Sequence, residues 1–335
     1  MPMNTTVRLA RRPTGMPVAD DFRISTEAVP EPGPGQVLVR VTMISLDPAM
    51  RGWLDDRPSY LPPVGLDEVI RAGAVGEVVA SENPRYPVGT TVQGDFGVQE
   101  YALSNGSGLV RVDPALGTPS MYLGVLGTTG LTAYFGLFEH GRPRAGDTVL
   151  VSAAAGAVGS IAGQLALISG CHVVGVAGGL DKCAYVTDTL GMHEAVDYKA
   201  AGMRRAVAAA CPDGIDVYFD NVGGPVLVAA LSALAMHARI VVCGAISQYN
   251  AEQVTPGPPN YMALLVRRAT MTGFLVFDHA AGYRTARQRL GRWVAEGRII
   301  APETIVRGDV ADFHPVFMRL FSGDNLGKLV LDISA

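Results

Sequence analysis

Cysteine and histidine are absent from the first 139 residues of the chain. Catalytic zinc in dehydrogenases is held by Cys and His side chains, with one coordination position left open. The whole chain has four cysteines and six histidines, and neither set shows ligand spacing. They are Cys171, Cys183, Cys211 and Cys243, and His140, His172, His193, His237, His279 and His314. The sequence therefore predicts no metal site, buried and reduced thiols, and histidines that are structural or solvated.

The chain also lacks a strong charge of either sign. Its formal net charge is −4 and no basic block stands out, so neither nucleic acid nor an anionic membrane is indicated as a partner. The N-terminal segment contains Arg8, Arg11 and Arg12 without the apolar core of a secretory signal. Asp20 and Asp21 follow, which is not typical of a transit peptide. A cytoplasmic location is the expectation.

One stretch, from Val149 to Gly179, has thirty-one residues without Asp, Glu, Lys or Arg. Its length and apolarity are enough to span a membrane. Seven glycines, however, divide it into a β-branched piece, a small-residue turn, a helical piece and a second Val-rich piece. The pattern predicts strands at 149–152 and 173–177 around a helix at 157–169. We therefore expect a buried strand, turn, helix and strand rather than a membrane span.

Two patterns of secondary structure divide the chain. The first part consists of short alternating strands separated by Gly and Pro, which indicates a β-rich domain, here a barrel. Apolar strands then alternate with helices, which requires a parallel sheet covered on both faces. The tail returns to short segments and is expected to pair with the first part. The predicted fold class is α/β, with a GroES-like β-barrel domain at 1–126 completed by 299–335, and a Rossmann doubly wound parallel-sheet domain at 127–298.

Residues 154–159, Ala-Ala-Gly-Ala-Val-Gly, follow a predicted strand and open a predicted helix, as a Rossmann phosphate turn does. Ala154 replaces the first glycine of the G-x-G-x-x-G pattern. Gly156 would admit a pyrophosphate close to the backbone, and Gly159 would let helix and strand approach. The helix N-terminus would supply N–H donors to the anion. This context predicts a dinucleotide site, and a merely tight structural turn is the alternative.

The end of the second predicted strand favours NADP(H) over NAD. An NAD site usually has an acidic residue there, about twenty positions after the turn. Here the strand ends in Val-Ala-Gly-Gly, and Lys182 lies just beyond it. Asp181 is the competing feature, because it can bind a ribose or cap the next helix. Only three of the 27 Lys and Arg residues are lysines, at 182, 199 and 328, and all three fall in segments expected near the cofactor.

Two tyrosines are candidates for stabilising a developing oxyanion without a metal, since a phenolic hydroxyl donates a hydrogen bond. Tyr60 lies in SYLPP and Tyr249 in AISQYN. Tyr249 follows the fifth predicted strand of the parallel sheet, at the carboxyl edge where ligands of open α/β sheets bind. Either tyrosine can instead fill the core with a tethered hydroxyl.

Six segments together resemble the zinc-independent, NADP-dependent alkenal/enone reductases of the medium-chain dehydrogenase/reductase superfamily: LTAYFGL, AAAGAVGS, YFDNVGG, CGAISQYN, PGPPNY and GDNLGK. The family includes prostaglandin reductases, also known as leukotriene hydroxydehydrogenases, plant double-bond reductases and bacterial curcumin reductases. The resemblance covers nearly the whole chain. It implies the GroES-like and Rossmann domains given above, and a homodimer.

The resemblance also implies the site. In the family, the cofactor gives a hydride to the β-carbon of an α,β-unsaturated carbonyl, and a tyrosine at the position of Tyr249 steadies or protonates the enolate. We therefore expect NADPH-dependent reduction of the carbon–carbon double bond of an enal or enone, with Tyr60 and Tyr249 contacting the substrate and Tyr249 catalytic. The implied NADP(H) contacts are Gly156, Ala157, Val158, Gly159, Lys182, Tyr198, Asn221, Cys243, Gly244, Ala245, Ile246, Ser247, Tyr249, Phe274, Leu275, Val276 and Asn325.

The chain departs from this family in two places. Relatives typically read SLDPYMRGRM where this chain has SLDPAMRGWL, so Ala49 replaces a tyrosine and Trp53 appears nearby. They commonly carry GWQEY where this chain has GVQEY, with Val98. We expect the loss of aromatic bulk to change which enones fit, so no single substrate is inferred. Quinone reduction, oxidation of a secondary alcohol, and nucleotide binding without turnover remain alternatives.

Overall fold

The computed structural model describes residues 2–253 and 255–334. The chain divides into two compact units. Unit 1 contains residues 1–123 and 303–335, and unit 2 contains residues 124–302. Unit 1 is thus built from both ends of the chain, and unit 2 from its middle.

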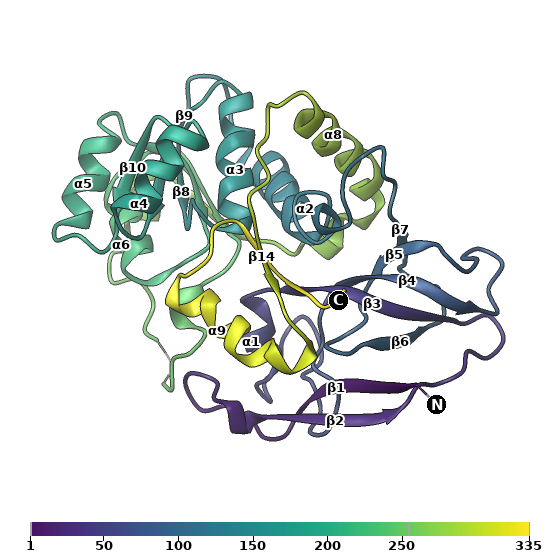
Figure 1. Cartoon of the computed structure of the whole chain (residues 1–335). Coiled ribbons are helices and arrows are strands. Elements are labelled where there is room, and N and C mark those ends of the chain that lie inside the picture. Colours follow the sequence, from purple (N-terminus) through teal and green to yellow (C-terminus); the bar gives the residue numbers. More distant parts are fainter. Residues whose placement is uncertain (1, 254, 335) are drawn as a thin grey trace. The chain divides into compact units, whose positions relative to one another are not determined.

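Unit 1 consists mainly of β-strands (Figure 1). β1 and β2 form an antiparallel hairpin. A seven-stranded sheet has the order β14-β15-β3-β4-β5-β7, with β6 also paired to β3. The tail strand β15 pairs antiparallel with β3. The elements of this unit are β1 (Met3–Leu9), β2 (Phe22–Ala28), β3 (Val37–Leu46), α1 (Ala49–Trp53), β4 (Ala74–Ser81), β5 (Thr91–Gly94), β6 (Tyr101–Ser104), β7 (Val110–Arg111), β14 (Glu303–Arg307), α9 (Phe313–Ser322) and β15 (Lys328–Asp332), with 3₁₀ turns at Ala19–Asp21, Ser120–Tyr122 and Val310–Asp312.

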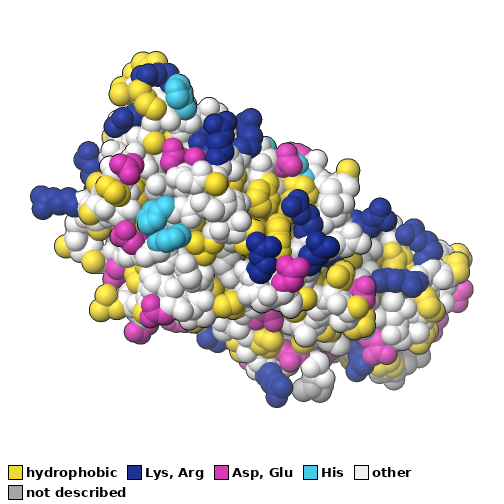
Figure 2. All heavy atoms as spheres, turned by 90° about the horizontal axis from the view of Figure 1, so that it is seen from above, with side chains coloured by type: hydrophobic (Ala, Val, Ile, Leu, Met, Phe, Trp, Pro, Cys, Tyr) yellow, Lys and Arg dark blue, Asp and Glu magenta, His cyan; other side chains and the backbone are white. Residues whose placement is uncertain are grey.

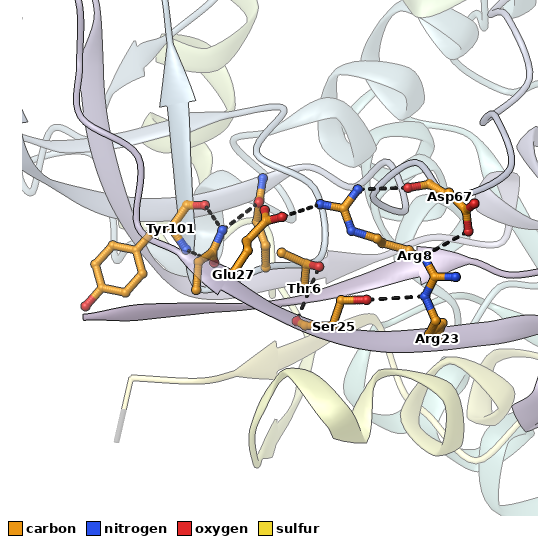
Figure 3. A network of polar contacts seen from close by, with 9 residues as sticks. Thr6, Arg8, Arg23, Ser25, Glu27, Asp67 and Tyr101 are labelled. Atoms are coloured by element: carbon orange, nitrogen blue, oxygen red, sulfur yellow. Dashed lines mark hydrogen bonds and ion pairs between the residues drawn. The ribbon is translucent and has the colours of Figure 1, made fainter. Parts of the chain in front are cut away.

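A network of polar contacts joins the β1–β2 hairpin to neighbouring segments (Figure 3). The buried Asn4 side chain accepts from the backbone N–H of Tyr101 at 2.9 Å and donates to its carbonyl at 3.1 Å. Arg8 donates to the carbonyl of Asp67 at 2.8 Å, and Arg23 pairs with the Asp67 carboxylate at 2.9 Å. The pair with Arg23 is exposed, so it contributes about 0–1 kcal/mol, and the buried amide of Asn4 does more to fix the hairpin.

Unit 2 contains a six-stranded parallel sheet with the order β10-β9-β8-β11-β12-β13. The chain runs outward from β8 to β10 and then crosses back to β11, so the strand order reverses between β8 and β11. Ligands of open α/β sheets bind at such a reversal, outside the carboxyl ends of the strands. The predicted Rossmann architecture is therefore confirmed. The strands are β8 (Thr148–Ser152), β9 (His172–Ala177), β10 (Glu194–Asp197), β11 (Ile215–Asp220), β12 (Leu234–Val242) and β13 (Thr270–Gly273).

Helices cover both faces of this sheet. Figure 1 shows α2, α3 and α8 gathered on one side and α5 and α6 on the other, and α2 packs against both α3 and α8. The helices are α2 (Thr128–Phe135), α3 (Ala157–Ile168), α4 (Leu180–Ala184), α5 (Met203–Ala210), α6 (Gly224–Ser232), α7 (Ala263–Arg267) and α8 (Tyr283–Ala295). Shorter turns are the π-helical η3 (Gly136–Gly141) and η4 (Tyr185–Thr189) and the 3₁₀ turns η5 (Ile246–Gln248) and η6 (Val276–Gly282).

The uncharged run 149–179 forms β8, a turn, α3 and β9, as predicted. Glycine allows close packing at two points of α3. A Cβ on Gly159 would lie 2.2 Å from the carbonyl oxygen of Ala153, and one on Gly163 would lie 2.0 Å from Cε of Met192. In the described part of the chain, no helix has both the length and the apolarity needed to cross a membrane.

The charges on the surface are mixed in sign, and the cysteines are free thiols. On the face displayed in Figure 2, basic side chains lie in several separate groups, with acidic side chains beside most of them. All four cysteines are free thiols. Cys171 and Cys211 are buried as expected, whereas the expectation was wrong for Cys183, which is only partly buried. Cys243 is partly buried as a whole residue, but its thiol is buried. Cys183 lies on the short, exposed α4, and Cys243 lies just beyond the end of β12.

Candidate functional site

The carboxyl edge of the parallel sheet begins with the glycine turn after β8. Ala153 takes a left-handed conformation with φ +50°, and the N–H of Gly156 donates to its carbonyl at 2.8 Å. Gly156 is the N-cap of α3 and has an extended conformation. Because glycine has no side chain to cover the first N–H groups of α3, these donors and the positive helix end can receive a phosphate. Gly159 one turn later keeps α3 against the turn.

The ends of β9 and β10 lie next to this turn. Tyr198 follows β10, and a Cβ on Gly178 would come within 2.8 Å of its hydroxyl, so the tyrosine lies across the glycine. Tyr198 is 48% exposed. Lys182 lies on α4, directly after β9, and is half-buried. The two predicted 2′-phosphate contacts thus follow adjacent parallel strands at the same edge.

Asp197 ties the same two strand ends together. Its Oδ1 accepts from the N–H groups of Gly179 at 2.8 Å and Lys199 at 2.9 Å. These two backbone hydrogen bonds lower the pKa of the carboxyl group. The Asp197 carboxylate at this edge of the sheet therefore accepts hydrogen bonds from backbone N–H groups. The suggestion that Asp181 caps the next helix was wrong, because Gly179 is the N-cap of α4 and Asp181 lies within its first turn.

A buried polar network fixes the ends of β8 and β11. The Asp220 carboxylate, which is 1% exposed, accepts from the Tyr218 hydroxyl at 2.7 Å and from Ser152 Oγ at 3.2 Å. Asn221 donates its backbone N–H to Ser152 Oγ and its side-chain amide to the Ser152 carbonyl, at 2.8 and 2.7 Å. Burial, then the charge of Asp220, raises the pKa of Tyr218 well above its ordinary value, so that hydroxyl remains protonated. Asn221 is thus held by Ser152 at the strand reversal.

The segment after β12 carries Tyr249. Its hydroxyl oxygen accepts from the N–H of Ala245 at 3.3 Å, and a Cβ on Gly244 would lie 2.8 Å from that oxygen. Ser247 Oγ donates to the carbonyl of Val222 at 2.6 Å, and the N–H of Ile246 donates to that of Asn221 at 3.2 Å. These bonds fasten the segment from Cys243 to Tyr249 to the end of β11. Burial, then the charge of Asp220, raises the pKa of Cys243 to about 12, so its thiol stays neutral.

Phe274, Leu275 and Val276 follow β13 at the same edge. The Phe274 ring stacks on His140 with centroids 5.0 Å apart, and Val276 is buried. His140 in turn lies 3.2 Å from His279, measured between their Nε2 atoms. Sequence reasoning missed this pair because its members are 139 residues apart. Asp197 and Asp220, in contrast, could have been found as acidic residues that end predicted strands.

The remaining predicted site residues lie in unit 1. Asn325 donates to the carbonyl of Gly327 at 3.0 Å. Tyr60 is 45% exposed, and its hydroxyl accepts from the indole N–H of Trp53 at 3.2 Å, so it does not fill the core. Val98 is fully buried in the unit 1 core. The expected effect of Val98 on which enones fit stays a prediction.

Lys328 does not support the argument from scarce lysines. It is 2% exposed in unit 1, where its ammonium donates to Asp47 Oδ1 at 2.7 Å and to the carbonyl of Leu46 at 2.6 Å. Burial lowers the pKa of this ammonium, and Asp47 opposes that shift. Lys328 thus pairs inside its own unit, and the argument for a 2′-phosphate depends on Lys182 and its neighbours.

Comparison with known proteins covers both units. Residues 5–112 match a family described as the N-terminal domain of oxidoreductase, and residues 157–292 match one described as zinc-binding dehydrogenase. Within residues 2–253 and 255–334, no group of three or more His, Cys, Asp or Glu side chains is placed to hold a metal. The side chains present therefore do not fit the zinc of the second description.

Three relatives span the full chain. An NADPH-dependent curcumin reductase of Escherichia coli is 43% identical over 97% of this chain and 96% of its own. An NADP⁺-dependent 2-alkenal reductase of Nicotiana tabacum is 37% identical over 99% of this chain and 98% of its own. The solved structure of CurA in complex with NADPH from Vibrio vulnificus is 41% identical, covers 99% of each chain and has a TM-score of 0.94.

Proposed function

The chain belongs to the NADP-dependent alkenal/enone reductases of the medium-chain dehydrogenase/reductase superfamily, and we propose that it reduces the carbon–carbon double bond of α,β-unsaturated aldehydes or ketones with NADPH. One observation carries the proposal. Parallel strands of one sheet bring the glycine turn of α3, Lys182 and Tyr249 to the same carboxyl edge. That edge is where open α/β sheets bind dinucleotides.

The residues of unit 2 fit NADP(H). Gly156 and the first N–H groups of α3 suit a pyrophosphate, and Lys182 with Tyr198 suits a 2′-phosphate. Asn221, the Cys243–Tyr249 segment and the 274–276 segment lie at the neighbouring strand ends. Asn325 is kept as a predicted contact on the family resemblance alone. When bound, the cofactor supplies a hydride for the β-carbon of the substrate.

Tyr249 is the proposed catalytic residue. Its hydroxyl oxygen accepts a hydrogen bond from Ala245, and such a bond makes the phenolic O–H a stronger donor. That O–H can hold the negative oxygen of the enolate that forms when the hydride arrives, and the α-carbon then takes a proton. One such donor is worth about 3–4 kcal/mol of transition-state stabilisation. Tyr60 is proposed as a substrate contact.

We propose a homodimer formed through β13 and α7. β13 is the last strand of the parallel sheet among the described residues, and an edge strand readily pairs with another copy. Near it lie exposed apolar residues that a monomer rarely leaves uncovered together: Tyr261 (60% exposed), Met262 (49%), Leu265 (68%) and Val266 (62%). A two-fold axis would place the same patch of both copies in contact.

A cytoplasmic location, to be tested by fractionation of cells, is supported by the four free thiols.

The proposed function is tested by NADPH oxidation over a panel of enals, enones, quinones and secondary alcohols, with identification of the products. A saturated aldehyde or ketone supports it. An allylic alcohol or a hydroquinone as the main product would favour the alternative oxidoreductase activities. Cofactor binding without oxidation across the panel would show that the fold binds nucleotide without turnover.

A further inference from the structure

Two histidines from distant segments of unit 2 meet at hydrogen-bond distance. His140 lies in the π-helical turn η3 and His279 in η6, and their Nε2 atoms are 3.2 Å apart. A hydrogen bond between two imidazoles needs one ring that donates and one that accepts. The pair can therefore form when both rings are neutral or when one is charged. It is lost when both are protonated, because neither nitrogen then accepts.

Each histidine is also stacked on a phenylalanine. His140 stacks on Phe274, with centroids 5.0 Å apart and planes at 29°, and His279 stacks on Phe135 at 4.8 Å and 8°. A Cβ on Gly136 would lie 2.5 Å from the Phe274 ring, so this ring lies between the backbone of η3 and the imidazole of His140. The two imidazole planes meet at 76°, so the hydrogen bond joins two stacked pairs edge to face in one cluster between α2 and the end of β13.

The segment 274–276 is held at both of its ends. Phe274 contacts His140 and Gly136 at one end, and the carbonyl of Val276 accepts from the Tyr283 hydroxyl at 2.9 Å at the other. The segment directly follows β13, at the edge of the sheet that carries the glycine turn. Its conformation therefore decides what it presents to a ligand at this edge.

We propose that His140 and His279 are positioning residues, whose hydrogen bond holds Phe274 and the 274–276 segment in the conformation that binds NADP(H). This inference rests on the proposed function, which makes the segment a cofactor contact. Protonation of both imidazoles breaks the bond and lets the segment move. Cofactor affinity then depends on pH through a pair that does not itself touch the reacting atoms.

The charged and titratable groups around the pair come from all the elements packed against it. They are Glu139 and Arg142 beside His140, Arg239 of β12, Asp278 beside His279, Tyr134 of α2, and Tyr283, Arg287 and Arg289 of α8. Burial, and then His279, lowers the pKa of His140, Glu139 opposes this shift, and Arg142 adds to it. The neutral form of His140 is thus favoured near pH 7, and the bond is lost only on the acid side.

Calorimetric titration of the full-length protein with NADP⁺, between about pH 5 and pH 8, tests this proposal. His140→Phe keeps a ring against Phe274 but removes the hydrogen bond. We expect about three- to tenfold weaker binding at pH 8, the range of one hydrogen bond, and a smaller further loss towards pH 5 than in the wild type. His279→Phe should give the same result, and the double variant should lose no more than either single one.

His140→Gln serves as the conservative variant, because an amide keeps hydrogen bonding and does not titrate. It should bind NADP⁺ as the wild type does at pH 8 and show the reduced acid loss of the Phe variants. His172→Phe is the matched control, since His172 packs on His193 with centroids 4.6 Å apart at the opposite strand ends. It should follow the wild type at every pH, including the titration of the cofactor's own 2′-phosphate near pH 6.

Three outcomes would overturn the positioning role: unchanged binding in His140→Phe and His279→Phe, additive losses in the double variant, or an acid loss in these variants as large as in the wild type. Thermal unfolding of each variant distinguishes weaker binding from loss of the fold. Failure of the proposed function looks different, because the wild type would then bind no NADP⁺ or reduce no enone at any pH.

Discussion

The hydroxyl oxygen of Tyr249 accepts a hydrogen bond from the backbone N–H of Ala245 at 3.3 Å. The bond closes a short turn after β12 and holds the hydroxyl oxygen of Tyr249 against the backbone of that turn. Gly244 makes this geometry possible, because a Cβ there would approach the same oxygen to 2.8 Å. The turn therefore sets the place of a hydrogen-bond donor at the carboxyl edge of the sheet.

Tyr249→Phe should slow turnover without abolishing it. Loss of one oxyanion donor typically lowers kcat by about 10²- to 10³-fold, while positioning of the reactants is retained. Steady-state kinetics with one enone, together with the Kd for NADPH, separates the two effects, and the Kd should change little. Tyr101→Phe is the control, because Tyr101 is a half-buried tyrosine on β6 of unit 1. Full activity of Tyr249→Phe on every enone would mean that Tyr249 only packs against its turn.

Lys182→Ala should weaken NADPH binding and leave NADH binding unchanged. A charge-assisted hydrogen bond contributes about 1.5–3 kcal/mol, which corresponds to roughly 10- to 100-fold in Kd. The ratio of the two dissociation constants is the readout, because it cancels general damage to the site. Arg298→Ala, which lies just after the C-terminal end of α8, should leave the ratio unchanged. Equal loss for both cofactors would place Lys182 away from the 2′-phosphate.

Gly159→Ala should mainly lower the stability of the fold, whereas Gly156→Ala should mainly lower the affinity for NADPH. A Cβ at 159 would lie 2.2 Å from a backbone oxygen that cannot move alone, so we expect a loss of about 1–3 kcal/mol or more in the free energy of unfolding. At 156 the nearest atom is 3.1 Å away, so the loss of stability should be smaller and the loss of NADPH affinity larger. Urea denaturation and cofactor titration measure the two effects. Equal stability losses would contradict the packing argument.

Local pattern was enough to predict the β8, α3 and β9 unit, because β-branched runs, glycines and helical spacing are all features of neighbouring residues. The position of Tyr249 after the fifth strand followed from the same alternation. β13 was not predicted: its four residues, TMTG, are half-buried or exposed and form no apolar run. Such a strand is recognised only when its partner β12 is seen.

Contacts between distant residues were the part that the sequence could not show. His140 and His279 have no local spacing that indicates a pair, and Lys328 lies near a predicted cofactor residue in sequence but pairs with Asp47 in space. Val98 illustrates the same limit, because its neighbours in the sequence do not show that its side chain packs in the unit 1 core. These features depend on tertiary packing, which overrides local preference.

Stability should fall as the pH rises above about 9, in part because of the buried thiols. Burial raises the pKa of Cys211 to about 12 and that of Cys171 to about 11, from an ordinary value of 9.0. Between these values the unfolded chain releases a proton that the folded chain keeps, so each thiol costs up to about 1.4 kcal/mol of unfolding free energy per pH unit. Cys211→Ala should therefore show a flatter slope between about pH 9 and pH 11 than the wild type. Identical slopes would contradict this assignment.

Leu265→Asp should shift the chain from dimer to monomer. Burying an unpaired carboxylate costs several kcal/mol, so the dimer dissociation constant should rise roughly 100-fold or more. Light scattering over a range of protein concentrations measures the mass in solution. Val88→Asp is the matched control, because Val88 is 63% exposed but belongs to unit 1 and is far from α7 and β13 along the chain. A wild-type chain that stays monomeric at every concentration, or a control that dissociates equally, would mean that the apolar residues of α7 do not form the interface.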